Sequence, residues 1–413
     1  MRFFASIFAV LIIFTSLTQP TLSQTTERKK PKIRNFGSSL ERKTEIKVNA
    51  KREKQIDTQD EDVIKIDTNI VVLDCLVADA KGKVITGLKP EDFKITEDNQ
   101  PQEIQTFTLG NDAKIPRSIV LVIDYSGSQK PYIERSVEAA KLLVDKLRQN
   151  DLMAIVTDDV EIISQFTSDK NKLKKELNSL KKNGFFSPKV GASKQFSALY
   201  AVLNEMFDET DVRPIIIFQT DGDELPFLSD QFGDLIYPQQ FERKTNFSTD
   251  ELFELTKKSR ASIYSVFVGT KLLGLSEAEK KQKSEIERER WAKYWGVNLD
   301  KIRYPTPQRQ ERMNQEQARI KKYYPNGFPD PQEFMSILSE QTGGWLAFLE
   351  EPEQADGIYT RILAELNTRY IIGFTPTNDA KDGRRRTVKV EVKNHPEYSV
   401  WGRKTYIPKP LDY

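Results

Sequence analysis

Two short polar segments of the chain each follow an uninterrupted apolar run. Asp124-Tyr125-Ser126-Gly127-Ser128 comes directly after residues 118–123, and Thr220-Asp221-Gly222-Asp223 follows the run at 215–218. Carboxylate and hydroxyl oxygens are hard donors, which bind Mg²⁺, Ca²⁺ or Mn²⁺ in preference to zinc. Ligands this few would leave coordination positions for water and for a partner's carboxylate. If the segments meet in space, they predict a divalent-cation site.

The elements around these segments predict that they do meet. A continuous apolar run is typical of a central parallel strand, because helices cover both of its faces. Ligands of doubly wound sheets bind beyond the carboxyl ends of the strands. Strands and helices alternate here, which predicts an α/β fold with a doubly wound, mostly parallel sheet. The expected strands are 118–123, 154–157, 162–166, 215–218, 262–268 and 345–349, and the expected helices are 133–147, 170–181, 197–208, 249–260, 331–341 and 358–366.

Both flanks of this α/β pattern have the period of two that is typical of short antiparallel strands. They span residues 63–110 and 369–413. Each is too short to bury a stable core alone, and the ends of a compact domain often lie close together. We therefore expect the flanks to form one β-sandwich-like unit, with the α/β domain of residues 111–368 inserted into it. Two separate β appendages are the alternative.

Residues 271–330 interrupt the α/β pattern. They contain 14 Lys/Arg and 9 Asp/Glu, few aliphatic positions and several prolines. We interpret them as a charged insertion whose residues 276–294 form an exposed helix.

The first residues indicate export. One arginine precedes an apolar run of about 13 residues, and small residues follow at Thr21 and Ser23. This pattern predicts a signal peptide over residues 1–23 and a periplasmic or secreted bacterial protein. Residues 24–62 are rich in Lys and Arg and poor in apolar residues, so we expect a basic disordered linker. Weak contact of this linker with an anionic envelope surface is the alternative to a solvated spacer.

Composition excludes several classes of protein. Hydrophobic residues make up 38% of the 413 residues and charged residues 30%, which argues against a polytopic membrane protein. The net charge of +2 implies no field for nucleic acid. Cys75 is the only cysteine, and we expect it to be a buried thiol. His395 is the only histidine, so a Ser-His catalytic pair would have to use it.

The motif Asp-x-Ser-x-Ser, followed by a hydroxyl on a second loop and by Thr-Asp-Gly, resembles the von Willebrand factor A (VWA) domain. In that family these elements form the metal-ion-dependent adhesion site. The resemblance implies that Asp124, Ser126, Ser128 and Asp221 hold the metal. The second-loop ligand is usually Thr, and Phe196-Ser197-Ala198-Leu199-Tyr200 matches that loop with Ser197 in its place. Ser193 is the alternative ligand.

The resemblance extends into the flanks. The segment 71–107, with Gly87-Leu88 and Asp92-Phe93, and the segment Arg369–Pro376 are similar to the VWA-related family of exported proteins found in Acidobacteria. This similarity covers roughly residues 63–407 without the insertion. It implies a fold and a metal site more than an activity.

These patterns favour a binding protein over an enzyme. We expect Mg²⁺, or else Ca²⁺ or Mn²⁺, at the site and a protein partner that offers an Asp or Glu carboxylate, with adhesion, envelope assembly or signalling as the process. A metal-independent scaffold with a vestigial site is the alternative, and a metal-dependent hydrolase is a weaker one. Asp158 and Asp159 are expected to be turn residues, and Asp223 and Glu224 are expected in a solvated loop. The sequence does not define the oligomeric state.

Overall fold

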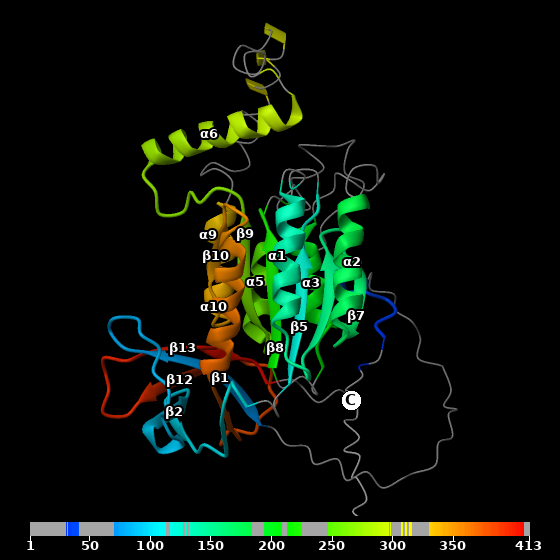
Figure 1. Ribbon diagram of the computed structural model, residues 1–413. Helices are drawn as coiled ribbons and strands as arrows, with labels where there is room; N and C mark the ends of the chain where they lie inside the picture. The colour runs from blue at the N-terminus through cyan, green and yellow to red at the C-terminus, as the bar shows by residue number, and fades with distance from the viewer. Residues whose placement is uncertain are drawn as a thin grey trace, which may run out of the picture.

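The chain builds an α/β domain with a β-sandwich at one end and a long charged helix at the other (Figure 1). The computed structural model describes residues 30, 32–40, 70–112, 116–126, 129, 132–183, 194–208, 213–222, 224, 247–296, 298, 307–308, 310–311, 314–315 and 330–408. The predicted signal peptide, most of the predicted linker and most of the insertion after residue 296 lie outside these residues.

A six-stranded sheet forms the centre of the α/β domain, in the order β10-β9-β8-β5-β6-β7. Its neighbours pair in parallel except β7, which is antiparallel to β6. Every residue of β5 and β8 is buried, as expected for central strands covered on both faces. The predicted doubly wound, mostly parallel sheet is confirmed. Its strands are β5 Arg117–Ile123, β6 Leu152–Thr157, β7 Glu161–Thr167, β8 Arg213–Thr220, β9 Ser262–Val268 and β10 Leu346–Leu349.

Helices cover both faces of this sheet. Ile119, Leu121 and Ile123 of β5 belong to one apolar core, and the alternating residues Val120 and Val122 belong to another. The first core is closed by α1 Ile133–Asp145, α2 Lys170–Asn183 and α10 Gln354–Thr368. The second is closed by α3 Gln195–Glu205, α5 Thr249–Lys258 and α9 Pro331–Gln341.

The two flanks of the chain share both sheets of the sandwich. β1 of the first flank pairs with β11 and β13 of the second, and β2 pairs with β12. One apolar core lies between the sheets and includes Leu73, Phe93, Tyr370 and Val388. The predicted joint unit is confirmed. One sheet contains β13 Ser399–Trp401, β1 Val71–Ala78, β11 Tyr370–Phe374 and β4 Thr106–Leu109, and the other contains β14 Thr405–Tyr406, β12 Arg386–Val392, β2 Phe93–Glu97 and β3 Gln100–Gln102.

Two strands predicted as continuous cross between the sheets instead. In the first, Gln102 pairs with β2 and Thr106 pairs with β11, so the residues between them carry the chain from one sheet to the other. The predicted strand at 399–406 divides in the same way into β13 and β14. Alternation alone does not reveal such a crossing, because both halves keep a period of two.

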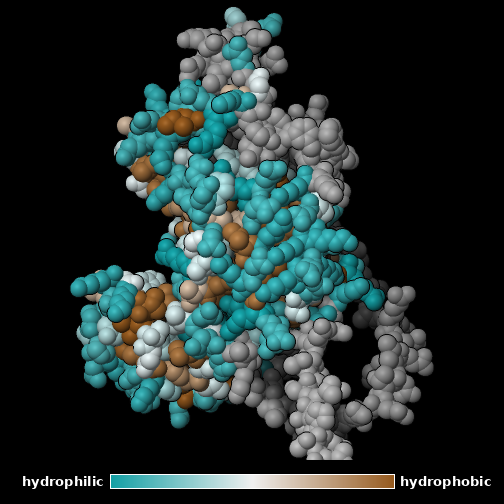
Figure 2. Space-filling view, in the orientation of Figure 1, coloured by the Kyte–Doolittle hydropathy of each residue, from teal (hydrophilic) through white to brown (hydrophobic). Residues whose placement is uncertain are grey.

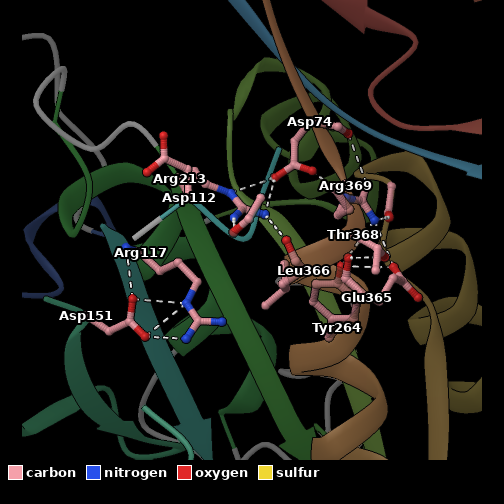
Figure 3. A network of polar contacts seen from close by, with 12 residues as sticks. Asp74, Asp112, Arg117, Asp151, Arg213, Tyr264, Glu365, Leu366, Thr368 and Arg369 are labelled. Carbon is pink, nitrogen blue, oxygen red and sulfur yellow. Dashed lines mark hydrogen bonds and ion pairs between the residues drawn. The ribbon is translucent and has the colours of Figure 1, made fainter. Parts of the chain in front are cut away.

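Two arginines join the sandwich to the α/β domain at the amino ends of the parallel strands (Figure 3). Arg213, at the start of β8, donates from Nε and Nη2 to Asp74 Oδ2 of β1 at 3.2 and 3.1 Å. Arg369, just before β11, donates to Asp74 Oδ1 and, at 2.8 Å, to Glu365 Oε1 of α10. Burial alone would raise the pKa of Asp74, but the two guanidinium groups outweigh it and lower this pKa. We call Asp74, Arg213, Glu365 and Arg369 the junction network.

Backbone carbonyls take the remaining donors of the junction network. Arg213 donates to the carbonyls of Gly110 and Leu366 at 3.0 and 2.7 Å. At Gly110 a Cβ atom would lie only 2.1 Å from the Leu366 carbonyl oxygen, so only glycine fits. A second buried pair, Arg117 with Asp151, lies at the same end of the sheet, with both Asp151 oxygens 3.0 Å from Arg117 Nε.

The charged insertion begins with α6, Glu277–Trp295. Ser276 starts this helix, because its hydroxyl accepts the N–H of Glu279 and the Glu279 side chain accepts the N–H of Ser276 in return. The helix contacts the carboxyl-end loops of the sheet through Glu287, which accepts the Thr270 hydroxyl at 2.7 Å. The predicted charged helix is present at this place.

A short N-terminal segment packs on the α/β domain. We call Lys30 and residues 32–40, which include the 3-10 turn Ser38–Leu40, the N-terminal strap. It contacts β7 and the carboxyl end of α3. The sequence predicted a disordered linker over residues 24–62, and for the strap that prediction is wrong. The strap docks because three of its apolar side chains, Ile33, Phe36 and Leu40, pack against the core of the α/β domain.

Two smaller predictions can also be compared. Cys75 is buried in the sandwich core, as expected, and burial raises the pKa of its thiol to about 12. In the part of the chain that the structure describes, none of the helices has the length and apolar character to cross a bilayer.

Candidate functional site

The two polar segments lie at the carboxyl ends of neighbouring strands. In the parallel pairing of β5 with β8, Ile123 is opposite Gln219. Asp124 follows the first strand and donates its N–H to the Gln219 carbonyl at 3.0 Å. Thr220 donates its hydroxyl to Asp124 Oδ2 at 2.7 Å. Asp124 and Asp221 therefore come to the same end of the sheet, opposite the junction network.

Neutral donors hold the Asp124 carboxylate. The side chain is buried, with 2% of the residue exposed. Its Oδ1 accepts the N–H of Ser126 at 2.9 Å, which fixes the tight turn of the first loop. Its Oδ2 accepts from Gln195 Nε2 at 2.9 Å, at the start of α3, besides the Thr220 hydroxyl. One carboxylate thereby connects the turn after β5, the start of α3 and the end of β8.

A second glutamine connects the first loop to Asp221. Gln129 Nε2 donates to Asp221 Oδ2 at 2.7 Å, and the N–H of Gln129 donates to the Ser126 carbonyl at 3.1 Å. Ser126 itself is buried. The remaining two predicted hydroxyls of this region, Ser128 and the alternative ligand Ser193, lie outside the described residues.

Ser197 lies in the first turn of α3, and its partner is Glu224. Its hydroxyl donates to Glu224 Oε1 at 2.7 Å, and the N–H groups of Phe196 and Ser197 donate to Oε2 at 2.5 and 3.1 Å. The carboxylate thus caps the helix, where free N–H groups and the helix dipole favour a negative charge. Glu224 was expected in a solvated loop, and this is wrong, because the residue is 2% exposed.

Burial changes the acidity of two carboxyl groups here. Desolvation raises the pKa of Glu224 to about 7, although its hydrogen bonds from Ser197 and Phe196 oppose the change. Burial also raises the pKa of Asp158 well above its ordinary value, and the nearby Asp124 adds to the effect. Asp158 lies in the predicted turn after β6 and accepts the N–H of Tyr125 at 3.1 Å. Carboxylates therefore crowd this end of the sheet.

The donor set fits a hard cation. Asp124 and Asp221 bring carboxylate oxygens, and Ser126 brings a hydroxyl, to one end of the sheet, and oxygen ligands suit Mg²⁺, Ca²⁺ and Mn²⁺. The side-chain oxygens of Gln129 and Gln195 are buried and have no hydrogen-bond partner. The Ser197 hydroxyl donates its hydrogen bond to Glu224, so its oxygen keeps both lone pairs for another contact. Among the residues described, no three Asp, Glu, His or Cys side chains are themselves grouped as a metal site.

Residues 119–224 match the sequence profile of the von Willebrand factor type A domain. The chain contains a VWA domain. The match ends on Glu224, so it includes the segment 124–128 after β5, the start of α3 and the segment 220–224 after β8. The narrower resemblance to exported proteins of Acidobacteria stays a prediction. No curated protein matches the chain significantly.

Several solved structures are similar to this chain at a low level. A von Willebrand factor type A protein from Catenulispora acidiphila is 9% identical, with 84% of this chain and 76% of that chain covered and a TM-score of 0.37. An aerotolerance-related membrane protein from Bacteroides fragilis is 13% identical, with 61% and 98% covered and a TM-score of 0.35. The manganese-loaded TRAP protein from Plasmodium vivax is 11% identical, with 75% and 97% covered and a TM-score of 0.30. The family assignment rests on the profile match.

Glu224, Gln129 and Gln195 were not predicted from the sequence as part of the site. Glu224 lies 27 residues from Ser197, and no local spacing links the two. The one available signal is the position of each residue directly beside a predicted ligand segment. Whether the predicted residues bind a cation stays a prediction.

Proposed function

We propose that this chain is an exported binding protein that engages a protein partner through a divalent cation at its VWA domain. The observation that carries the proposal is the meeting of Asp124, Ser126 and Asp221 at one end of the sheet, on loops tied together by Gln195 and Gln129. The proposed ligands are Asp124, Ser126, Ser128, Ser197 and Asp221.

Each described ligand has a support that fixes its position. The Ser126 N–H and the Thr220 hydroxyl hold the Asp124 carboxylate on opposite oxygens. Glu224 accepts the hydrogen bond of the Ser197 hydroxyl, which leaves the lone pairs of the Ser197 oxygen for a cation. Such supporting hydrogen bonds orient metal ligands in proteins. The loops are therefore set before any partner binds.

A partner's Asp or Glu is the expected counterpart. A divalent cation at this site, Mg²⁺ or else Ca²⁺ or Mn²⁺, would offer an open coordination position to an incoming carboxylate. The described ligands bring two formal negative charges, which leaves such an ion with unsatisfied attraction for an anion. Coulombic attraction is stronger at a partly buried site than in water.

A binding role is better supported than hydrolysis. A hydrolase of this kind would need a base beside the site. Glu224, whose pKa is raised to about 7, is engaged there as the cap of α3 by the N–H groups of Phe196 and Ser197 and by the Ser197 hydroxyl. His395, the sole histidine, lies in a turn of the sandwich, where it stacks on Tyr398 at 4.4 Å between ring centroids. The charged helix α6 borders the same end of the sheet as the proposed site and would form part of the partner surface (Figures 1 and 2).

The proposal is tested by capture of envelope proteins on the immobilised chain, with Mg²⁺ and with EDTA. We expect a partner that is retained in Mg²⁺, released by EDTA and recovered when Mg²⁺ is restored. Asp124→Ala should abolish capture, whereas the control Asp382→Ala, in an exposed turn of the sandwich, should not. Capture that neither EDTA nor Asp124→Ala changes would overturn the proposal.

A further inference from the structure

The N-terminal strap makes a specific contact with the carboxyl end of α3. Glu205, the last residue of this helix, accepts the N–H of Gly37 at 2.8 Å and the N–H of Ser39 at 2.7 Å, and the Ser39 hydroxyl donates to it as well. A carboxylate at a helix carboxyl end is unfavourable, because the helix dipole is negative there. The hydrogen bonds from Gly37 and Ser39 compensate that cost. The charge of Glu205 is therefore stabilised at the helix end only when the strap is docked.

Other contacts extend this docking along the edge of the sheet. The side-chain amide of Gln165 in β7 exchanges two hydrogen bonds with the backbone of Ile33, at 3.2 and 3.1 Å, much as a neighbouring strand would. Lys30 Nζ lies 4.5 Å from the centre of the Phe166 ring and 3.7 Å from Asp208. Ile33, Phe36 and Leu40 pack against the core behind α3. The strap lies beside β7 in Figure 1.

The opposite end of the same helix carries the candidate site. Gln195 donates to Asp124, and Ser197 donates to Glu224, both from the first turn of α3. The helix has 11 residues and a length of about 16 Å at 1.5 Å per residue. A helix this short moves as one body, so a contact that fixes Glu205 also fixes Gln195 and Ser197.

We propose that docking of the N-terminal strap holds α3 in the position that favours cation binding, so that release of the strap weakens the site. This inference rests on the proposed function. The surface made by Glu205, Gln165 and Phe166 is a peptide site, and its occupant is the chain's own N-terminal strap. Whatever competes for that segment or that surface would lower the affinity of the site for its cation.

Variants of the full chain test this from both sides of the contact. Glu205→Gln removes the acceptor charge on the domain. Ser39→Pro removes two of the three donors and alters only the strap, so it leaves the fold of the domain intact. Glu103→Gln is the matched control, since it makes the same chemical change at an exposed site between β3 and β4. Backbone hydrogen exchange over residues 32–40 reports docking, and calorimetric titration with Mg²⁺ alone reports the site.

Both strap variants should exchange faster over residues 32–40 and bind Mg²⁺ about fivefold more weakly or worse. The double variant should bind Mg²⁺ no more weakly than the single variant that has the lower Mg²⁺ affinity, because both substitutions act on one contact. The control should match the wild-type chain. Faster exchange with Mg²⁺ affinity unchanged or increased would overturn the inference and leave the proposed function standing. No Mg²⁺ binding by the wild-type chain would overturn both, while the exchange data would still show whether the strap docks.

Discussion

The two ends of the central sheet both bury carboxylates, but they balance them differently. At the amino ends of the strands, Asp74 is paired with Arg213 and Arg369, and Asp151 is paired with Arg117. At the carboxyl ends, the hydrogen bonds described for Asp124 and Glu224 come from amide N–H groups and hydroxyls, which carry no charge, and the charge of Lys194 has only a minor effect on the pKa of Glu224.

The acidity of the carboxyl groups follows this difference. The pKa of Asp74 is lowered, since the arginines outweigh the effect of burial. The pKa of Glu224 rises to about 7 and that of Asp158 rises also, because burial prevails there. The junction therefore supplies its own cations and is a permanent structural contact. Burial of carboxyl groups prevails at the other end, where we propose that a cation from solution binds.

The largest effect is expected from removal of a junction cation. Arg369→Met would remove a fully buried guanidinium from the partly buried Asp74 and Glu365, which costs about 3–5 kcal/mol in the free energy of unfolding. Urea denaturation of the full chain measures this cost. Arg384→Met, at an arginine whose side chain is 87% exposed, is the control and should change stability by less than about 0.5 kcal/mol. Equal effects of the two would mean that the junction network adds no stability.

Acid should remove part of the same stability. Because the folded-state pKa of Asp74 is below the ordinary value of 3.8, its contribution is present above that pH and is lost as the pH falls through the folded-state pKa. Asp74→Asn should cost about 2–3 kcal/mol at neutral pH. The difference between this variant and the wild-type chain should then shrink below pH 4. A difference that stays constant down to pH 3 would contradict the paired state of Asp74.

A smaller loss is expected at the carboxyl end. Glu224→Ala would leave the N–H groups of Phe196 and Ser197 without their acceptor at the start of α3, at a cost of about 1–2 kcal/mol. Hydrogen exchange should speed up in the first turn of this helix. The control is Glu103→Ala, which removes an exposed glutamate. If protection of the first turn were unchanged, the capping role of Glu224 would be wrong.

The smallest expected effect is a change in stability that differs in sign between the two ends of the sheet. Asp158→Asn keeps the acceptor for the Tyr125 N–H and removes a carboxyl group that lies near Asp124. In EDTA the variant should be as stable as the wild-type chain or more stable, by up to about 1 kcal/mol. The same Asp→Asn change at Asp74 should destabilise. Destabilisation by both changes would remove the contrast between the two ends.

Elements with strong local signals could be predicted from the sequence. The strand at 262–268 and the helix at 331–341 have the bounds predicted for them, because the first is a compact apolar run and the second begins with Asp330 as its cap and Pro331 in its first turn. The positions of Asp124 and Asp221 followed from the same strand pattern. These features are determined by residues that are close together in the sequence.

Features that depend on distant partners could not be predicted. Arg369 meets Asp74 across 295 residues, and Glu205 meets Gly37 across 168. The strap has the composition of a solvated linker, and its docking depends on partners far away in the sequence, namely Glu205, Gln165 and the apolar core behind α3. Glu224 looked like one more acid in a polar loop, and its burial depends on the free N–H groups of a helix that precedes it in the chain.

Titration of the metal-free full chain with Mg²⁺ by calorimetry tests the central claim most directly, with Asp124→Ala alongside. We predict one Mg²⁺ bound per chain by the wild-type protein and none by Asp124→Ala. No binding by the wild-type chain, or equal binding by the variant, would contradict the conclusion that this end of the sheet takes its positive charge from solution.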